Sequence, residues 1–476
     1  MKKISELCKR VKIIETNVMQ DYFITGIETD SSKVKEGYLF FVTDGNAQYV
    51  PDAVKNGAIC LIGEKMYDYP CIRVENVRIA LSIASSNFYD HPEKKLKIIG
   101  VVGTNGKTSI THILYELMKP YKKSAVIGTL GVWIQGEKIE SEMTSPDPQY
   151  LFAYLSEAAR QGVEYAFCEI SAHAIFYQKF YGIKCEICVF TNITQDHLDF
   201  FEEMERYARV KMNYFSKNNM KTAVINADDP YGQKLLQTTD VCAVSYGIDQ
   251  PSDVFAIDIE NKNGLKFVVN AFDEIFYAST RFEGKFNVYN ILAAFTVARL
   301  LGVETGELQS RIQMISPIAG RVNRIWQSPK IVVDYAHTPD GLQNVLQTLK
   351  ETCCGKLIAV FGCGGNRDRS KRKIMATIGT QIASVCIFTS DNPRDEDPED
   401  ILRDMTNELS AGNYICIPDR ANAIDFAIRL ACPDDCVAIC GKGEEKYIEM
   451  KGKKVPFNDK EYCLSVLENR LCQKLF

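Results

Sequence analysis

The chain has 476 residues and a formal net charge of −5, and 46% of its residues are hydrophobic while 25% are charged. That composition is typical of a soluble globular protein, and the length predicts about three domains. The negative charge argues against a nucleic-acid partner. No apolar stretch approaches the roughly 20 residues that span a bilayer and the N-terminus lacks a signal-peptide core, so we expect a cytoplasmic protein without membrane insertion.

The first section of the chain reads as a small α/β unit. Residues 37–42 and 59–62 are apolar runs typical of strands, and Gly57 follows the helical segment between them. His91-Pro92 interrupts the chain before the next apolar run. The sequence therefore predicts an N-terminal domain over residues 1–93.

A glycine-rich segment follows the apolar run Leu96-Lys-Ile-Ile and reads Gly100-Val-Val-Gly-Thr-Asn-Gly-Lys-Thr108. A strand, a glycine-rich turn ending in Lys-Thr and then a helix form a site for nucleotide phosphates. Backbone N–H groups face the anion, the lysine neutralises its charge, and the threonine hydroxyl can hold Mg²⁺. The spacing differs from the common P-loop because Val101 stands where that motif has glycine. A turn without a ligand is the alternative interpretation.

The middle section alternates strands and helices. Residues 165–170, 186–190 and 222–225 are short apolar runs ending in polar residues, as in buried parallel strands that lead into a site. Residues 254–277 alternate in polarity and predict antiparallel strands, and residues 288–301 predict an apolar helix. We expect a central P-loop-type ATPase domain of the α/β class over residues 94–326.

A second alternating series begins near residue 327. Four helical segments separate five strand-like runs, which predicts a doubly wound, Rossmann-like C-terminal domain over residues 327–476. The expected strands are 331–334, 357–361, 385–388, 414–417 and 436–439, and the expected helices lie near 340–349, 371–383, 398–409 and 421–431.

The seventeen cysteines occur mostly in apolar strands, where reduced thiols act as small hydrophobes. Cys185 and Cys188 have CxxC spacing, but neither a second such pair nor a nearby histidine completes a zinc set. A structural role is favoured over a metal or redox site.

Three of the five histidines follow predicted strands: His173, His197 and His337. One such histidine alone would be interpreted as a loop residue, but three at strand ends, two of them beside the phosphate loop, favour function. Glu169 also ends a strand, and with the Thr108 hydroxyl it predicts a Mg²⁺ pair beside the phosphates. The alternative for Glu169 is an exposed acid.

Seven ordered motifs together resemble those of the Mur ligases, the ATP-dependent amide-bond ligases that build the peptidoglycan stem peptide. The resemblance covers nearly the whole chain and implies an N-terminal UDP-sugar-binding, a central ATP-binding and a C-terminal amino-acid-binding domain. The motifs are Gly103-Thr-Asn-Gly-Lys-Thr108, Glu169-x-Ser-x-His173, Thr191-Asn-Ile-x-x-Asp-His-Leu-Asp199, Asn226-Ala-Asp-Asp-Pro230, Phe286-Asn-x-x-Asn290, Gly320-Arg321 and Asp334-Tyr-Ala-His-Thr-Pro-Asp340.

Within that family the C-terminal motifs look most like those of the members that add the third residue of the stem peptide. The resemblance implies that the D-glutamate γ-carboxylate of UDP-MurNAc-L-Ala-D-Glu attacks the γ-phosphate of ATP, forming an acyl phosphate. The amine of meso-diaminopimelate then displaces phosphate. Lys107 and two Mg²⁺ ions would neutralise the two anions.

Other residue roles also come from the resemblance. Thr108 and Glu169 match ligands of one Mg²⁺ and His197 matches a ligand of the other. Lys211 matches a lysine that CO₂ converts to a carbamate (N6-carboxylysine), although spacing alone would make it a surface lysine.

We expect a monomer whose partners are its small-molecule substrates. The positions matched to ATP contacts are Gly103, Thr104, Asn105, Gly106, Lys107, Thr108, Asn290, Arg321, Asp334 and His337, the last two reaching the site when the domains close.

The positions matched to the acid substrate depart from the family pattern. Ser32 stands where arginine is usual and Ala172 where a second serine is usual. Lys179 replaces an arginine, so a point charge takes the place of a bidentate fork. The matched positions are Ser31, which corresponds to a uridine contact, and Thr144, Ser145, Ser171 and Lys179.

The segment Asp391-Asn-Pro-Arg394 resembles the form associated with meso-diaminopimelate, whose distal carboxylate an arginine can clamp. A turn with an exposed arginine is the alternative. Asn366 and Glu444 stand where aspartate and histidine are usual. The positions matched to this amino acid are Arg367, Asp391, Asn392, Arg394, Gly441 and Glu445.

Two rival functions stay open. These departures leave room for a Mur-ligase-like enzyme that adds L-lysine or joins another acid and amine. A nucleotide-gated binding protein without ligase chemistry is the rival from another class, and the retained Lys107, Glu169 and Lys211 argue against it.

Overall fold

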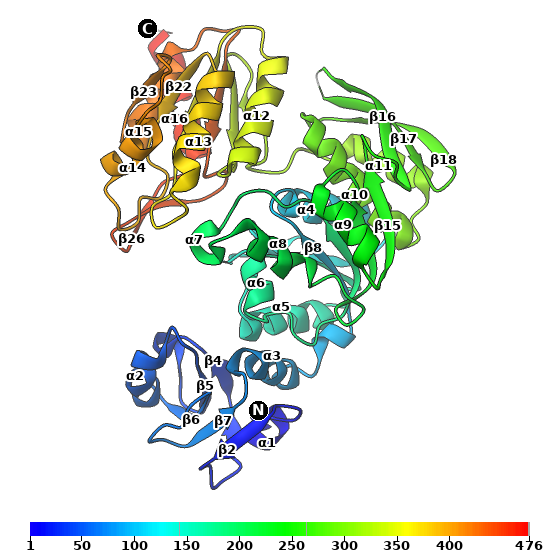
Figure 1. The fold of residues 1–476 in the computed structure, drawn as a ribbon, viewed down its shortest axis with the longest axis vertical. Coiled ribbons are helices and arrows are strands. Elements are labelled where there is room, and N and C mark those ends of the chain that lie inside the picture. The colour runs from blue at the N-terminus through cyan, green and yellow to red at the C-terminus, as the bar shows by residue number, and fades with distance from the viewer. Residues whose placement is uncertain (142, 263, 475–476) are drawn as a thin grey trace.

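The computed structural model describes residues 1–141, 143–262 and 264–474. These form three α/β domains in chain order, each built on its own main sheet (Figure 1). No helix of the described residues is long and apolar enough to cross a membrane.

The N-terminal domain has a five-stranded sheet with apolar clusters on both faces. Its elements are β1 (Lys2–Lys3), α1 (Ile4–Leu7), β2 (Ile13–Thr16), β3 (Phe23–Ile24), β4 (Gly26–Glu28), η1 (Ser31–Lys33), β5 (Tyr38–Val42), η2 (Ala47–Tyr49), α2 (Val50–Lys55), β6 (Ala58–Gly63), β7 (Cys71–Val74), α3 (Val77–Phe88) and η3 (Pro92–Lys94). The strand order is β2-β7-β6-β5-β4, and only the β2–β7 pair is antiparallel.

The central domain is built on an eleven-stranded sheet covered by helices on both faces. Its elements are β8 (Lys97–Val102), α4 (Lys107–Met118), β9 (Ser124–Gly128), β10 (Gly131–Ile134), β11 (Glu137–Ile139), α5 (Pro148–Arg160), β12 (Tyr165–Ile170), α6 (Ala172–Phe176), β13 (Cys185–Phe190), α7 (Leu198–Phe201), α8 (Met204–Met212), β14 (Met220–Asn226), α9 (Pro230–Thr238), β15 (Cys242–Gly247), β16 (Val254–Asn261), β17 (Leu265–Ala271), β18 (Glu274–Thr280), α10 (Lys285–Leu300) and α11 (Thr305–Met314).

The middle of this sheet is parallel, and its strand ends carry the predicted site. The order is β11-β10-β9-β12-β8-β13-β14-β15-β16-β17-β18, with β12 and β13 parallel to β8 on either side. Side chains alternate along β8, so that Ile99 enters one core and Ile98 the other. The antiparallel strands predicted over 254–277 are confirmed in β16–β18.

One glycine of the predicted loop belongs to the strand instead. Gly100 lies within β8, and a Cβ added there would lie 2.6 Å from the Ile170 Cδ1 and 3.2 Å from the Cys188 Sγ. Gly100 therefore permits close packing between strands, and the phosphate-loop glycines are Gly103 and Gly106.

The C-terminal domain has a six-stranded sheet that confirms the predicted doubly wound series. Its elements are β19 (Asn323–Trp326), β20 (Lys330–Asp334), α12 (Pro339–Thr352), β21 (Leu357–Phe361), α13 (Ser370–Ile382), β22 (Val385–Phe388), α14 (Pro398–Thr406), β23 (Tyr414–Cys416), α15 (Arg420–Leu430), β24 (Cys436–Cys440), β25 (Tyr447–Met450), β26 (Lys453–Pro456) and α16 (Asp459–Lys474). The order is β19-β20-β24-β21-β22-β23, and β19 is an antiparallel edge.

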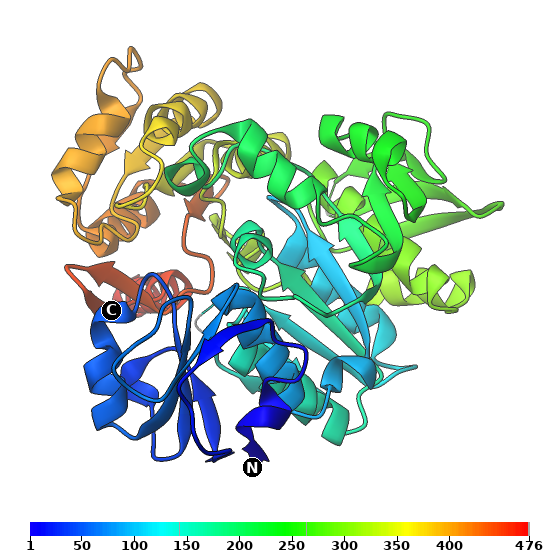
Figure 2. The same cartoon turned by 60° about the horizontal axis from the view of Figure 1, so that its bottom comes forward.

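Two features lie at the borders between the domains. The β25–β26 hairpin projects from the C-terminal domain toward the N-terminal domain (Figures 1 and 2). The strand β19, which precedes the predicted boundary at 326, pairs with the C-terminal sheet. The domain limits of 1–93, 94–326 and 327–476 stay predictions.

Candidate active site

The phosphate loop joins β8 to α4 in a shape that only glycine permits at two positions. A Cβ added at Gly103 would lie 1.7 Å from the Thr191 Oγ1. Gly106 has a left-handed φ of 88° and would bring its Cβ 2.7 Å from the Asn290 Oδ1. The Lys107 Nζ donates to the carbonyls of Gly103 and Thr104, both at 2.8 Å. The loop thus has a defined form at the N-terminus of a helix, where an anion is stabilised.

Thr108 and Glu169 meet as predicted. The Thr108 hydroxyl donates to the Glu169 Oε2 at 2.9 Å because β12 lies beside β8 and delivers Glu169 to the same sheet edge. Thr129 donates to this carboxylate through its backbone N–H and its hydroxyl. The Arg321 Nη2 donates to the Thr108 Oγ1 at 3.1 Å. A carboxylate and a hydroxyl thus converge at the start of α4, and these hard oxygen ligands suit Mg²⁺.

Lys211 is buried on α8, with 1% of its surface exposed. Its Nζ lies 2.5 Å from the Tyr207 hydroxyl and 3.4 Å from the Thr104 Oγ1. Burial, and secondarily the charge of Lys107, lowers the pKa of Lys211 well below its ordinary value. Burial therefore shifts the balance toward the neutral amine, which is the form that reacts with CO₂.

His197 lies beside a buried acid that the sequence analysis did not select. The His197 Nε2 lies 3.3 Å from the Asp196 Oδ2, and the His337 Nε2 lies 3.9 Å from the same oxygen. Burial lowers the pKa of His197 to about 3, against the opposing effect of Asp196. The His173 ring packs edge-on against His197 at a centroid distance of 4.7 Å. His197 is thus a fixed neutral imidazole, the form that binds a metal.

The C-terminal domain contacts the phosphate loop directly. The Asn105 Nδ2 donates to the Asp340 Oδ2 at 2.7 Å. Asp334, whose pKa burial raises, accepts from the backbone N–H groups of Val322 and Ala336, both at 2.6 Å. Asp334 thereby fixes the backbone segment that contains Arg321, and this segment places the Arg321 side chain at the start of α4.

These groups line a cavity of about 480 Å³ between the central and C-terminal domains, a size typical of small-molecule sites. Nine of the ten predicted ATP positions line this cavity, and Gly103 is the exception. Other predicted site residues that line it are Glu169, His197, Thr144 and Ser171. Four predicted site residues lie outside its lining: Lys211, Ser31, Ser145 and Lys179. Lining residues that the sequence analysis missed include Thr129, Asp196, Asp228, Lys285, Tyr289 and Asp340.

Asp228 is the most connected of the missed residues. Its Oδ2 accepts from the Tyr289 hydroxyl at 2.8 Å and from the Ile248 N–H at 2.6 Å, and its Oδ1 accepts from the Gln250 N–H at 2.7 Å. The motif Asn226-Ala-Asp-Asp-Pro230, which follows a predicted strand, is the sequence feature that could have identified Asp228 as a site residue.

The positions predicted for the acid substrate form one hydrogen-bonded group, apart from Ser31. The Ser145 Oγ donates to the Glu169 carbonyl at 2.8 Å and accepts from the Ser171 N–H at 3.1 Å. Lys179 forms an ion pair with Asp147 at 2.7 Å and donates to the Ser145 carbonyl. Thr144 shares a 3.0 Å hydrogen bond with Thr129. Ser31 lies in the N-terminal domain, where its carbonyl accepts from Asn56.

The positions predicted for the amino acid converge around a buried lysine. The Lys442 Nζ, whose side chain is 0% exposed, donates to the Asn392 Oδ1 at 3.0 Å and to the Glu445 Oε2 at 2.8 Å. A Cβ added at Gly441 would lie 2.5 Å from the Asp391 Oδ2, an oxygen that is buried without a hydrogen-bond partner among the described residues. Lys442 was missed, although it lies between two selected positions.

Arg394 is held from two sides. Its Nε lies 3.2 Å from the Glu449 Oε2, and its Nη1 donates to the Gly365 carbonyl at 2.8 Å. Arg367 is more exposed and lies 3.9 Å from Asp199 of the central domain. Gly364 lies against both arginines, since a Cβ added there would meet the Arg394 Nη1 at 3.0 Å and the Arg367 Cγ at 3.6 Å. Two cationic side chains thus lie near one another beside the buried lysine cluster.

The metal ligands predicted from sequence do not form a classical cluster. Thr108 and Glu169 are in contact. His197 lines the same cavity, and Lys211 lies outside its lining. Across residues 1–141, 143–262 and 264–474 there is no group of three or more His, Cys, Asp or Glu side chains placed to hold a metal.

The phosphate loop, the strand-end carboxylate and the contacting C-terminal domain define the class of the protein. Residues 101–298 match the Mur ligase middle domain, and residues 320–443 match the Mur ligase, glutamate ligase domain. The chain belongs to the Mur ligase family.

Particular relatives are similar over nearly their whole length. The UDP-N-acetylmuramoyl-L-alanyl-D-glutamate–2,6-diaminopimelate ligase of Bacillus cereus is 39% identical over 94% of this chain and 95% of its own. The enzyme of that name from Clostridium botulinum is 36% identical over 92% and 94%.

Solved structures agree in fold. A structure of a diaminopimelate ligase of the same name has a TM-score of 0.67 and 32% identity, covering 98% of this chain and 99% of that one. MurF ligase from Thermotoga maritima, solved in complex with ADP, shares the fold with a TM-score of 0.64 and 19% identity, over 96% of this chain and 100% of that one.

Proposed function

We propose that the chain is an ATP-dependent, ADP-forming ligase that joins meso-diaminopimelate to the D-glutamate γ-carboxylate of UDP-MurNAc-L-Ala-D-Glu in peptidoglycan synthesis. The observation that carries the proposal is the cavity in which the phosphate loop, Glu169 and Arg321 converge. The names of the relatives support the substrates, and the resemblance of the segment 391–394 supports the amine.

The ATP phosphates would lie along the loop at the start of α4, where the backbone and Lys107 offset their charge. The acid substrate would enter from the side of Thr144 and Ser171, which line the same cavity. Its γ-carboxylate attacks the γ-phosphorus and ADP leaves, which produces an acyl phosphate. The amine nitrogen then attacks the acyl carbon, and the C–O bond breaks to release inorganic phosphate and a proton.

Mg²⁺ would be held by Thr108 and Glu169 at one position and by His197 at another, and when bound it screens the two reacting anions. Lys211 would serve as a carbamate: the neutral Nζ adds to the carbon of CO₂ and loses a proton, so the amine would become a carbamate with two acceptor oxygens. Thr104 and Tyr207 would orient this group.

The amino acid would be bound by Asp391, Asn392, Arg394 and Glu445, with Arg394 binding the distal carboxylate as a bidentate partner. Since L-lysine lacks that carboxylate, Arg394 would favour diaminopimelate. Arg367 and Gly441 complete the proposed contacts.

Phosphate release tests the proposal. Purified protein receives ATP, Mg²⁺ and the UDP-dipeptide with either meso-diaminopimelate or L-lysine, and we expect release that depends on diaminopimelate. If neither amine supports release, the stem-peptide assignment is wrong; release with lysine alone would refute the role of Arg394.

A further inference from the structure

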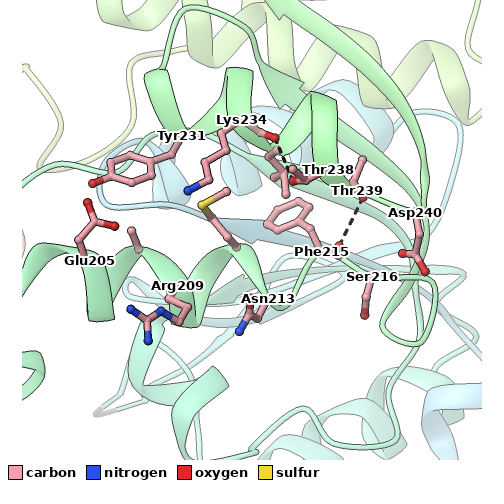
Figure 3. A pocket seen from close by; sticks show the side chains of 13 residues that line it. Glu205, Arg209, Asn213, Phe215, Ser216, Tyr231, Lys234, Thr238, Thr239 and Asp240 are labelled. Atoms are coloured by element: carbon pink, nitrogen blue, oxygen red, sulfur yellow. Dashed lines mark hydrogen bonds between the residues drawn. The ribbon is translucent and has the colours of Figure 1, made fainter.

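A second cavity of about 550 Å³ lies between α8 and α9, outside the proposed catalytic centre. Figure 3 shows Tyr231, Lys234 and Phe215 pointing into the space between the two helices. Its base is apolar, because Ala208, Phe215 and Leu235 are each at most 4% exposed. The volume suits a small organic molecule.

At the opening of the cavity the acidic side chains have partners, whereas the basic ones have none among the described residues. Glu205 lies against the Tyr231 hydroxyl and, after burial, is a cause of the raised pKa of that tyrosine. Asp240 accepts from the Lys217 N–H at 3.0 Å and lies 3.6 Å from its Nζ. The two cations, Arg209 and Lys234, are exposed and have no ion-pair partner among the described residues. An anionic ligand would therefore find basic side chains here that are free to pair with it.

We propose that this cavity is a second ligand site, which binds a small organic anion with an apolar body. The apolar part would cover Phe215 and Leu235, while the carboxylate, sulfonate or phosphate group would lie at the Lys234 ammonium, which points into the space between the helices (Figure 3). Burying the apolar part favours binding, and the Lys234 charge selects against a neutral molecule of the same shape.

The site shares its walls with the catalytic centre. Tyr207 and Lys211 lie on one face of α8, whereas Ala208, Arg209 and Met212 line the second cavity from another face of the same helix. Pro230, the first residue of α9, lines the nucleotide cavity and the adjacent Tyr231 lines the second one. A ligand that shifts α8 therefore also shifts Lys211.

Fluorescence titration of the whole protein tests the site. The probe is 8-anilino-1-naphthalenesulfonate, an aromatic ring system with one anionic group, and saturating ADP is present to fill the nucleotide cavity. We expect one bound probe per chain. Lys234→Glu should weaken binding at least tenfold, and Thr238→Trp, at an exposed position lining the cavity, should abolish it.

Two controls make the result specific. Lys266→Glu reverses an exposed lysine on β17 that also lacks an ion pair within the described chain, and it should leave probe binding unchanged. The neutral analogue N-phenyl-1-naphthylamine should be insensitive to Lys234→Glu. Probe binding that ADP abolishes, or that Lys234→Glu and Thr238→Trp do not weaken, would overturn the proposal.

Coupling through α8 has its own measurement. At saturating probe the ADP affinity should change, and by reciprocity the probe affinity should change by the same factor when ADP binds. An ADP affinity identical with and without probe would refute the coupling, whatever the outcome of the direct titration.

Discussion

Replacing Arg394 should reduce the use of diaminopimelate in graded steps. Arg394 is oriented by Glu449 at 3.2 Å and by the Gly365 carbonyl at 2.8 Å, so its fork is fixed before the substrate arrives. In the proposed complex, two charge-assisted hydrogen bonds to the distal carboxylate would contribute about 1.5 kcal/mol each, at the low end of the usual range. Arg394→Lys keeps one donor and should lose roughly tenfold in kcat/KM, while Arg394→Ala should lose roughly 100-fold, at about 1.4 kcal/mol per tenfold.

The assay is ATP-dependent phosphate release with the UDP-dipeptide, run in parallel with meso-diaminopimelate and L-lysine. The kcat/KM for lysine should not change in either variant, because lysine lacks the distal carboxylate that Arg394 would bind. Arg403→Ala is the matched control: it removes an exposed arginine whose ion-pair partner is Asp400, and it should leave both substrates unaffected. Equal losses for both amines, or no loss with diaminopimelate, would refute the reasoning.

Three further predictions concern catalysis and stability. Lys211→Ala should lose activity that millimolar acetate or propionate partly restores by supplying the missing oxygens; an active variant that gains nothing would refute the carbamate. Asp459→Ala leaves the fully buried Arg420 without its bidentate partner, at 2.6 and 2.7 Å, and should cost about 3–5 kcal/mol in urea unfolding. A loss below about 1 kcal/mol would contradict this. Burial lowers the pKa of His112 to about 4, so as the pH falls below 6.5 the unfolded chain takes up a proton that the folded chain does not. The free energy of unfolding should therefore fall as the pH is lowered from 6.5 to 4. In His112→Phe this fall should be smaller, and an identical pH profile would exclude His112 as its cause.

Much of the fold and part of the site follow from local sequence. The apolar runs at 165–170 and 357–361 coincide with β12 and β21, because buried parallel strands are short, apolar and end in polar residues. Glu169 and Thr108 were paired correctly because the carboxyl ends of neighbouring parallel strands lie together.

The remaining contacts depend on residues that only the tertiary fold brings together. The Asn105–Asp340 hydrogen bond joins positions 235 residues apart, and no local pattern encodes it. Lys442 was missed because a buried lysine cannot be told from an exposed one by spacing. Gly100 was assigned to the loop because a packing glycine and a phosphate-loop glycine have the same side chain, and only the neighbouring Ile170 separates the two roles.

The position of the nucleotide cavity between two domains has a thermodynamic consequence. Thr108 and Asn105 on one wall belong to the central domain, whereas His337 and Asp340 on the other belong to the C-terminal domain, so a ligand in the cavity would bind to both. Unfolding of either domain would remove part of the binding surface, so the ligand's free energy of binding would oppose the unfolding of both. A nucleotide bound there would therefore couple the unfolding of the two domains.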